Sequence, residues 1–250
     1  MNTTENYYPV QGSQSKNIGI ILFHAYTGTP NDVNLLARKL NRNGYDVLCP
    51  VFQGHGTDDI FDILNAPISS WQEDAKQALA FMVDQAYDSI MVFGLSLGGI
   101  IATWLLSQDQ GQLKAGGMFN SPILPDSLVD LQTPFLAYAR ALYMSNNRLE
   151  QFVNDKKQII DQHNQQMQAL NDFRQAMGPK LTKINVPFFV AQSGQDELVD
   201  SRPEADFLTF INPNYLDYHF YPDNSHVITV NRNRQAFEQD LFEFLEQANQ

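Results

Sequence analysis

From residue 18 onward, short apolar runs alternate with longer stretches in which apolar residues recur every three or four positions. The short runs predict buried strands, and the longer stretches predict amphipathic helices. Strands that are apolar throughout and separated by helices are typical of a parallel sheet covered on both faces. The pattern therefore predicts an α/β fold, with strands at residues 18–23, 46–50, 89–93, 115–119, 187–191 and 215–220.

The predicted helices begin with one capped by Thr29, with Pro30 at its first position and Gly44 after its end. Others are expected over 71–86, over 99–106 and at the carboxyl end around 237–248. Between residues 121 and 183 no strand is visible, and long helical patterns cover 134–145 and about 149–177. We interpret 121–183 as a helical cap inserted into a core of residues 1–120 and 184–250. A cap would cover the carboxyl ends of the strands, where open α/β sheets bind ligands, although extra helices packed elsewhere are the alternative.

Composition narrows the function classes. The 250 residues carry a net charge of −12, which disfavours nucleic acid as a partner because a phosphate backbone would be repelled. The single cysteine, Cys49, excludes an internal disulfide and ends an apolar run, so we expect a buried, unreactive thiol. The amino terminus lacks the pattern of a secretory signal, and the longest apolar segment is interrupted by glycines. We expect a cytoplasmic protein without stable membrane insertion; its oligomeric state is not readable.

The most informative segment is residues 94–98, Gly-Leu-Ser-Leu-Gly, between a predicted strand and a predicted helix. A serine in this setting occupies the sharp strand-to-helix turn known as a nucleophile elbow. Glycines at 94 and 98 let strand and helix approach closely while Ser96 adopts a strained backbone conformation. The pattern predicts Ser96 as a nucleophile, and the alternative is a chance match.

A serine nucleophile needs a base that removes its proton. Of the histidines after Ser96, His163 falls on the apolar stripe of a helix, where a core or interface histidine is expected, and His219 lies within the last strand. His226 lies in the loop between that strand and the last helix. The loop position favours His226 as the base; the alternative is an ordinary surface histidine.

The base must be held in one tautomer by an acid. The loop after strand 187–191 carries Asp196, which we prefer, and Glu197 and Asp200, which compete with it. Any of these carboxylates could instead be a solvated loop charge.

Acyl transfer also requires N–H donors for the developing oxyanion. The backbone N–H groups of Leu97, after the nucleophile, and Tyr26, in the loop after the first strand, are the candidates. No cofactor is implied, because no Gly-x-Gly-x-x-Gly pattern and no metal pattern is present. His55, although followed by two aspartates, is interpreted as loop architecture.

The chain resembles small bacterial carboxylesterases of the α/β-hydrolase superfamily, which are related to monoacylglycerol lipases. The resemblance covers nearly the whole chain from residue 18, including the position of the cap. It rests on His-Ala-Tyr-Thr-Gly at 24–28, Gly-His-Gly at 54–56, Trp71 with Asp74, Gly-Leu-Ser-Leu-Gly-Gly at 94–99, Asp196, and Ser-His-Val-Ile-Thr at 225–229. This chain has Ala25 where the family usually has glycine, and Asp-Asn-Ser at 223–225 where a Ser-Gly before the histidine is commoner.

The resemblance implies an α/β-hydrolase fold and a small-molecule ester substrate with a short to medium acyl chain. It also implies catalysis through an acyl-enzyme by Ser96, His226 and Asp196, with an oxyanion hole from the N–H groups of Tyr26 and Leu97. Two other function classes stay open: an amidase or peptidase on the same triad, and a non-catalytic ligand-binding relative.

Overall fold

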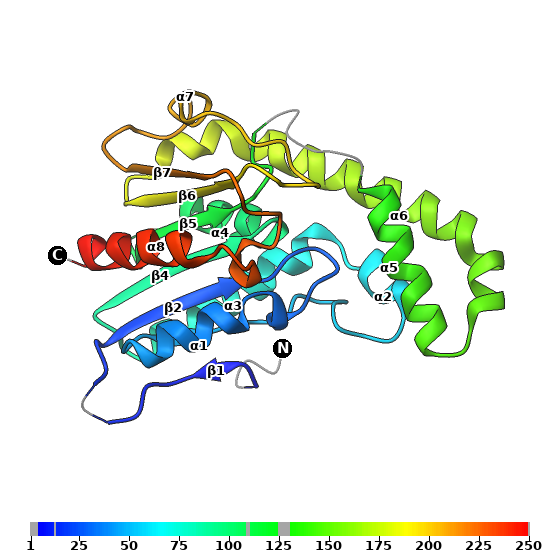
Figure 1. Ribbon diagram of the computed structural model, residues 1–250, viewed down its shortest axis with the longest axis horizontal. Coiled ribbons are helices and arrows are strands. Elements are labelled where there is room, and N and C mark those ends of the chain that lie inside the picture. The colour runs from blue at the N-terminus through cyan, green and yellow to red at the C-terminus, as the bar shows by residue number, and fades with distance from the viewer. Residues whose placement is uncertain (1–4, 13, 109–110, 125–130, 250) are drawn as a thin grey trace.

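The computed structural model describes residues 5–12, 14–108, 111–124 and 131–249, and it is built around one seven-stranded sheet (Figure 1). The strand order is β1-β3-β2-β4-β5-β6-β7, with β1 antiparallel to β3 and every other neighbouring pair parallel. The carboxyl ends of the parallel strands therefore meet at one edge. The strands are β1 (Tyr7–Tyr8), β2 (Ile18–Phe23), β3 (Asp46–Leu48), β4 (Ser89–Leu95), β5 (Leu113–Phe119), β6 (Phe188–Ser193) and β7 (Leu216–Tyr221).

Alternation along the strands divides the core into two apolar layers. In β2, Ile20 and Leu22 pack into the layer shared with α1 (Asn34–Arg42) and α8 (Gln235–Ala248), whereas Ile21 and Phe23 pack into the opposite layer. Successive side chains of a strand point to opposite faces, so an uninterrupted apolar run fills both layers. This explains why the central strands read as continuous apolar segments.

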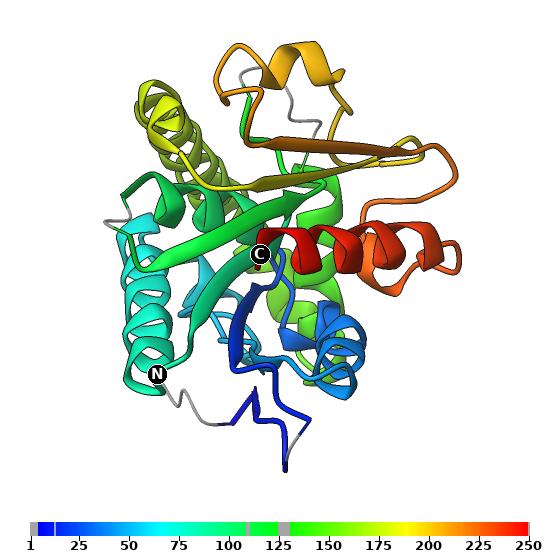
Figure 2. The ribbon, with the colours of Figure 1, turned by 90° about the vertical axis from the view of Figure 1, so that its left-hand side faces the viewer.

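The helices cover both faces of the sheet (Figure 2). α1 and α8 lie on one face, and α3 (Ile68–Asp84) and α4 (Leu97–Gln108) lie on the other. α4 is buried along nearly its whole length, which is the position expected of a helix that is apolar on all sides. Its amino terminus is therefore held firmly where β4 ends.

Two long helices, α5 (Gln132–Ser145) and α6 (Leu149–Met177), follow β5 and precede β6. We call this pair the helical insertion. Much of it extends beyond the sheet on the side where the strands end (Figure 1). α6 leads through η2 (Gly178–Lys183) back to the core. Residues 125–130 of the predicted insertion lie outside the described residues.

The predicted strands and long helices are present, and the differences are local. The helix expected after Thr29 is divided into η1 (Pro30–Asp32) and α1, with Val33 between them at φ −119°. Thr29 still caps, because its hydroxyl accepts from the Asn31 N–H at 3.3 Å; a 3₁₀ turn at a helix start is common. Three short elements had no pattern that predicted them: β1, α2 (Ile60–Leu64) and α7 (Glu204–Phe207).

Candidate active site

Ser96 is the only residue between β4 and α4, and its φ of 54° lies in the left-handed region. A serine adopts this conformation only where its surroundings impose it. The Ser96 N–H donates to the Phe119 carbonyl at 2.9 Å, and its own carbonyl accepts from the N–H groups of Gly99 and Ile100. These bonds fix the turn expected of a nucleophile elbow.

The two glycines around Ser96 are required by close backbone approach. A Cβ on Gly94 would lie 2.1 Å from the Gly98 carbonyl carbon, and one on Gly98 would lie 2.4 Å from the Phe23 carbonyl oxygen. Contacts this short with backbone atoms leave no room for any side chain. The pattern Gly-x-Ser-x-Gly is therefore dictated here by packing of β4, α4 and β2.

Asp196 and His226 form a buried pair. His226 Nδ1 lies 2.9 Å from both carboxylate oxygens of Asp196, and each side chain is only 3% exposed. Asp196 Oδ1 also accepts from the N–H groups of Leu198 and Val199 at 2.9 Å each. The carboxylate is thus fixed by the backbone, and it directs the Nδ1 hydrogen of the ring toward itself, leaving Nε2 as the free basic nitrogen.

Of the competing carboxylates, Glu197 accepts from the His226 backbone N–H at 3.2 Å, whereas Asp200 is exposed. Within the described ranges, neither makes a hydrogen bond to the imidazole ring. The structure therefore brings Asp196, and not its competitors, to the ring of His226.

Ser96 and His226 line one cavity of about 250 Å³. Within the described residues no hydrogen bond joins the Ser96 hydroxyl to the His226 ring; in structures without substrate such catalytic bonds are often long. The lining is mostly apolar on the sides supplied by the helical insertion and by the loops after β6 and β7. The lining residues are Ala25, Tyr26, Thr27, Gly28, Asp32, Ser96, Leu131, Pro134, Phe135, Leu198, His226 and Val227.

Two backbone N–H groups are available beside this cavity. Leu97 is the first residue of α4, so its N–H has no acceptor within the helix. Tyr26 lies in the loop after β2 and lines the cavity. Over the described ranges, neither N–H donates to another group of the protein. The two N–H groups therefore stay candidates for the donors that an oxyanion requires.

The loop that carries Tyr26 is fixed by His24 and Asp32. His24 Nδ1 donates to the Ala25 carbonyl at 2.8 Å, and His24 Nε2 accepts from the Phe52 N–H at 3.1 Å. Complete burial lowers the pKa of His24 to about 3, so the ring is neutral. On the other side of Ala25, its N–H donates to Asp32 Oδ2 at 3.2 Å.

Ala25 is accommodated where the family usually has glycine. The φ of Ala25 is not positive, and in this loop Thr27 adopts the left-handed conformation instead, at φ 61°. Alanine therefore meets no conformational penalty at position 25.

The motif residues Trp71 and Asp74 hold a second loop. Trp71 Nε1 donates to the Gln53 carbonyl at 3.0 Å, and Asp74 Oδ2 accepts from the Gln53 N–H at 2.7 Å. The adjacent His55 is 5% exposed, burial lowers its pKa to about 4, and its ring packs against those of His24 and Trp71. This agrees with the interpretation of His55 as loop architecture.

The remaining candidate nucleophile and bases lie elsewhere. Cys49 is fully buried, which raises the pKa of its thiol. His163 is 2% exposed and stacks on Phe135 with ring centroids 4.2 Å apart. His219 lies in β7, and a hydrogen bond to Asp217 raises its pKa. None of the three is among the residues that line the cavity of Ser96.

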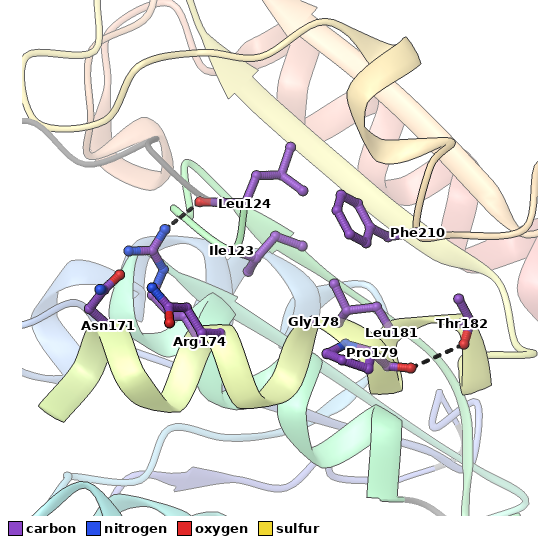
Figure 3. A pocket seen from close by; sticks show the side chains of 10 residues that line it. Ile123, Leu124, Asn171, Arg174, Gly178, Pro179, Leu181, Thr182 and Phe210 are labelled. Carbon is purple, nitrogen blue, oxygen red and sulfur yellow. Dashed lines mark hydrogen bonds between the residues drawn. The ribbon is translucent and has the colours of Figure 1, made fainter.

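A second cavity, of about 320 Å³, shares no lining residue with the first. It is mostly apolar and lies between the end of α6, η2 and the segment after β5; Figure 3 shows Phe210 and Leu181 pointing toward one another across it. The guanidinium of Arg174 donates to the Leu124 carbonyl at its edge. Among the described residues that line it there is no serine, cysteine or histidine, so it is not our candidate for the chemistry.

Two further findings concern the described ranges alone. They hold no cluster of histidine, cysteine or carboxylate side chains that could bind a metal ion. None of their helices combines the length and the apolar composition that crossing a bilayer requires.

Comparison with known proteins decides the family. The family model described as "Serine aminopeptidase, S33", a hydrolase family, matches residues 14–233. The chain belongs to this family. A carboxylesterase of Bacillus subtilis (strain 168) is 25% identical to this hydrolase over 228 residues, 91% of this chain and 92% of the relative. A thermostable monoacylglycerol lipase of Bacillus sp. (strain H-257) is 30% identical over 105 residues, 42% of this chain and 40% of the relative.

The fold is that of the α/β-hydrolases. A solved structure of metagenome-derived lipolytic enzymes, described for LipS and LipT, superposes with a TM-score of 0.73 and 17% identity, covering 97% of both chains. The likeness extends over the helical insertion as well as the sheet, because almost the whole of each chain is aligned. The superposition confirms the predicted fold class, and the family match together with the two relatives confirms the resemblance.

Sequence reasoning did not single out some residues that shape the site. Asn120 holds the backbone of His226, and Gln166 of α6 bonds the hydroxyl of Tyr26. The role of Asp32 was also not foreseen, although its place seven residues after Ala25 in a turn is a weak signal. Gln166 lies in a glutamine-rich segment, and nothing in the sequence distinguishes it from the other glutamines there.

Proposed function

We propose that this hydrolase is a serine carboxylesterase that cleaves short- to medium-chain carboxylic esters through an acyl-enzyme. The observation that carries the proposal is the buried Asp196–His226 pair at the cavity that also contains Ser96 in its strained turn. A nucleophile, a base and an acid at the ends of three strands of one sheet is the arrangement that acyl transfer requires.

In the proposed mechanism, His226 Nε2 removes the proton of Ser96 as its oxygen attacks the ester carbonyl. Negative charge then develops on the carbonyl oxygen, where the N–H groups of Tyr26 and Leu97 stabilise it. The imidazolium, held by Asp196, protonates the departing alcohol. Water attacks the acyl-enzyme with the same base, and Ser96 leaves with its proton restored.

The cavity argues for a small acyl group. At about 250 Å³ it lies below the range of roughly 300–1,000 Å³ that is usual for drug-sized ligands. Its apolar lining includes Leu131, which precedes α5, and Pro134 and Phe135, which lie in α5. Short to medium acyl chains, including those of monoacylglycerols with such chains, fit this space better than long ones.

Residues 121–183 are proposed to act as a cap on the core formed by 1–120 and 184–250. The support is that Leu131, Pro134 and Phe135 close one side of the cavity that contains Ser96. A cap that excludes water strengthens every electrostatic interaction at the reacting centre.

The test is turnover of p-nitrophenyl butyrate by Ser96→Ala, with Ser145→Ala, an exposed serine of α5, as the matched control. Ser96→Ala is expected to lose about 10⁴-fold or more in kcat while unfolding at the same denaturant concentration. A fluorophosphonate probe should label the wild type and Ser145→Ala but not Ser96→Ala. Wild-type turnover by folded Ser96→Ala would refute the proposal.

The family description makes an aminopeptidase the second candidate. An aminopeptidase must bind a substrate ammonium. Among the described residues that line the cavity, Asp32 alone carries a carboxylate. Its Oδ2 already accepts from the Ala25 N–H. A matched ester and anilide of the same acyl group discriminate the two: an esterase prefers the ester strongly, whereas an aminopeptidase also cleaves the anilide of a free amino acid.

A further inference from the structure

Tyr26 belongs to two parts of the molecule at once. It lines the cavity that contains Ser96, and its side chain packs against the helical insertion. The Tyr26 ring stacks on Phe135 of α5, with centroids 5.6 Å apart and an interplanar angle of 19°. Its hydroxyl donates to Gln166 Oε1 of α6 at 2.6 Å. A loop residue of the core is therefore anchored on both helices of the insertion.

Both polar atoms of the Gln166 side-chain amide form hydrogen bonds. The residue is only 7% exposed, and besides accepting from Tyr26 it donates from Nε2 to the carbonyls of Ile63 and Ala66 at 2.7 and 2.9 Å. Backbone carbonyls can only accept, so the NH₂ group must face them and the oxygen must face the Tyr26 hydroxyl. The orientation of the amide is thus determined by its partners.

These bonds connect three segments. Ile63 lies in α2 and Ala66 follows its end, Gln166 lies in the middle of α6, and Tyr26 lies in the loop after β2. A buried amide with satisfied partners fixes one relative position of those segments, because any shift leaves a polar group unpaired. Gln166 is therefore a rigid link and not a solvated glutamine like its exposed neighbour Gln165.

The core side of the same loop is held by other contacts. The Ala25 carbonyl accepts from His24 Nδ1 and from the Gly28 N–H, and the Ala25 N–H donates to Asp32. The Tyr26 N–H belongs to the same planar peptide as the Ala25 carbonyl, so these contacts constrain its direction from the core side. The Tyr26 Cα ends that peptide, and the bond to Gln166 and the stacking on Phe135 hold it from the side of the insertion.

We propose that Gln166 is a positioning residue that ties the helical insertion to the loop after β2, so that the seating of α6, together with the contacts of Ala25, holds in place the peptide that carries the Tyr26 N–H. The inference rests on the proposed esterase function. An oxyanion donor acts only within about 2.7–3.1 Å of the oxygen it stabilises. Loss of the link therefore weakens transition-state stabilisation more than substrate binding.

The variants are Gln166→Met, which keeps the length of the side chain without its amide, and Tyr26→Phe, which removes the hydroxyl and keeps the backbone N–H. Each is expected to lower kcat on p-nitrophenyl butyrate by about tenfold or more, with KM changed less than about twofold. Gln165→Met, on the exposed face of the same helix, is the matched control and should keep wild-type kcat and KM.

The double variant tests whether the two side chains act through their shared bond. Removing both partners leaves neither end of the Tyr26–Gln166 bond unpaired, and the carbonyls of Ile63 and Ala66 lose the Gln166 donor equally in Gln166→Met and in the double variant. The kcat of the double variant should therefore be no lower than that of the worse single variant. Losses that multiply in the double variant would overturn the link, and so would unchanged kcat in folded Gln166→Met. If Gln166→Met does not fold, Tyr26→Phe decides alone: wild-type kcat in that variant contradicts the proposal.

Failure of the inference is distinguishable from failure of the function. If the wild type does not hydrolyse esters, or if Ser96→Ala still hydrolyses them, the esterase assignment fails, and the proposed role of Gln166 fails with it. If Ser96→Ala is inactive and Gln166→Met equals Gln165→Met in kcat, the function stands and the positioning role alone is refuted.

Discussion

The side-chain amide of Asn120 donates to the backbone carbonyl of His226 at 2.7 Å, and also to Ser193 Oγ at 2.9 Å. Asn120 follows β5, is 1% exposed and has a φ of 45°. One buried amide thus joins the end of β5 to the end of β6 and to the loop that carries the proposed base. The position of His226 depends on its backbone as much as on Asp196.

Asn120→Ala is expected to lower the free energy of unfolding by about 1–3 kcal/mol, because the carbonyl of His226 loses a buried donor. Ester turnover should also fall, since the loop of the base is released. Denaturant unfolding and kcat measure the two effects, with exposed Asn154→Ala of α6 as the control. Unfolding and turnover equal to those of the control would contradict the role of Asn120.

His24 predicts a pH-dependent stability. Its folded pKa of about 3 lies below the ordinary value of about 6.5, so between these pH values the unfolded chain binds a proton that the folded chain does not. Stability from this group is complete above pH 6.5 and is lost as pH falls. At pH 5 the loss is about 2 kcal/mol.

Urea unfolding of the wild type and of His24→Asn at pH 7.5 and pH 5 checks this. The wild type should lose about 2 kcal/mol more than the variant on acidification. His219 offers an opposite control, because its pKa is raised by Asp217 and its contribution is lost as pH rises. The wild type should therefore exceed His219→Asn in free energy of unfolding by more at pH 5 than at pH 7.5. If the stability difference between wild type and variant changes with pH in the same way for His24→Asn and His219→Asn, the role given to His24 is contradicted.

The elbow glycines predict a sharp contrast between two glycine substitutions. Gly98→Ala would force a Cβ to within 2.4 Å of the Phe23 carbonyl oxygen, and it is expected to cost more than about 4 kcal/mol or to prevent folding. At Gly178 nothing lies within 4 Å of the added carbon, and its φ of −45° is helical. Gly178→Ala should be neutral or stabilise by up to about 1 kcal/mol. Comparable midpoints in thermal unfolding would show that the elbow tolerates a side chain.

Cys49 predicts resistance to thiol reagents. The thiol is fully buried and its pKa is raised, so the reactive thiolate is not accessible in the folded protein. Iodoacetamide should leave ester turnover unchanged and should label Cys49 only after unfolding in urea. Inactivation of the folded protein that follows labelling would instead implicate the cysteine.

Local patterns were sufficient for much of the fold and for the elbow. The place of Ser96 in a sharp turn could be predicted because its glycines, strand and helix are consecutive in the chain. The loop position of His226 could be predicted because it follows the last strand. The links through Asn120 and Gln166 could not, because each is created by segments that only tertiary packing brings together, 106 residues apart for Asn120 and His226 and 140 for Tyr26 and Gln166. β1 was missed for a related reason. Two tyrosines are too few to show an alternating pattern, and they form a strand only by pairing with β3 at the edge of the sheet.

The order of the sheet has a consequence for how activity is gained during folding. Ser96 follows β4, whereas Asp196 and His226 follow β6 and β7, and β5 lies between the two groups and pairs with both β4 and β6. No partial product of synthesis that stops before the last strand can bring these groups together. Recovery of turnover during refolding would therefore lag behind helix formation and report the moment at which β7 joins its neighbours.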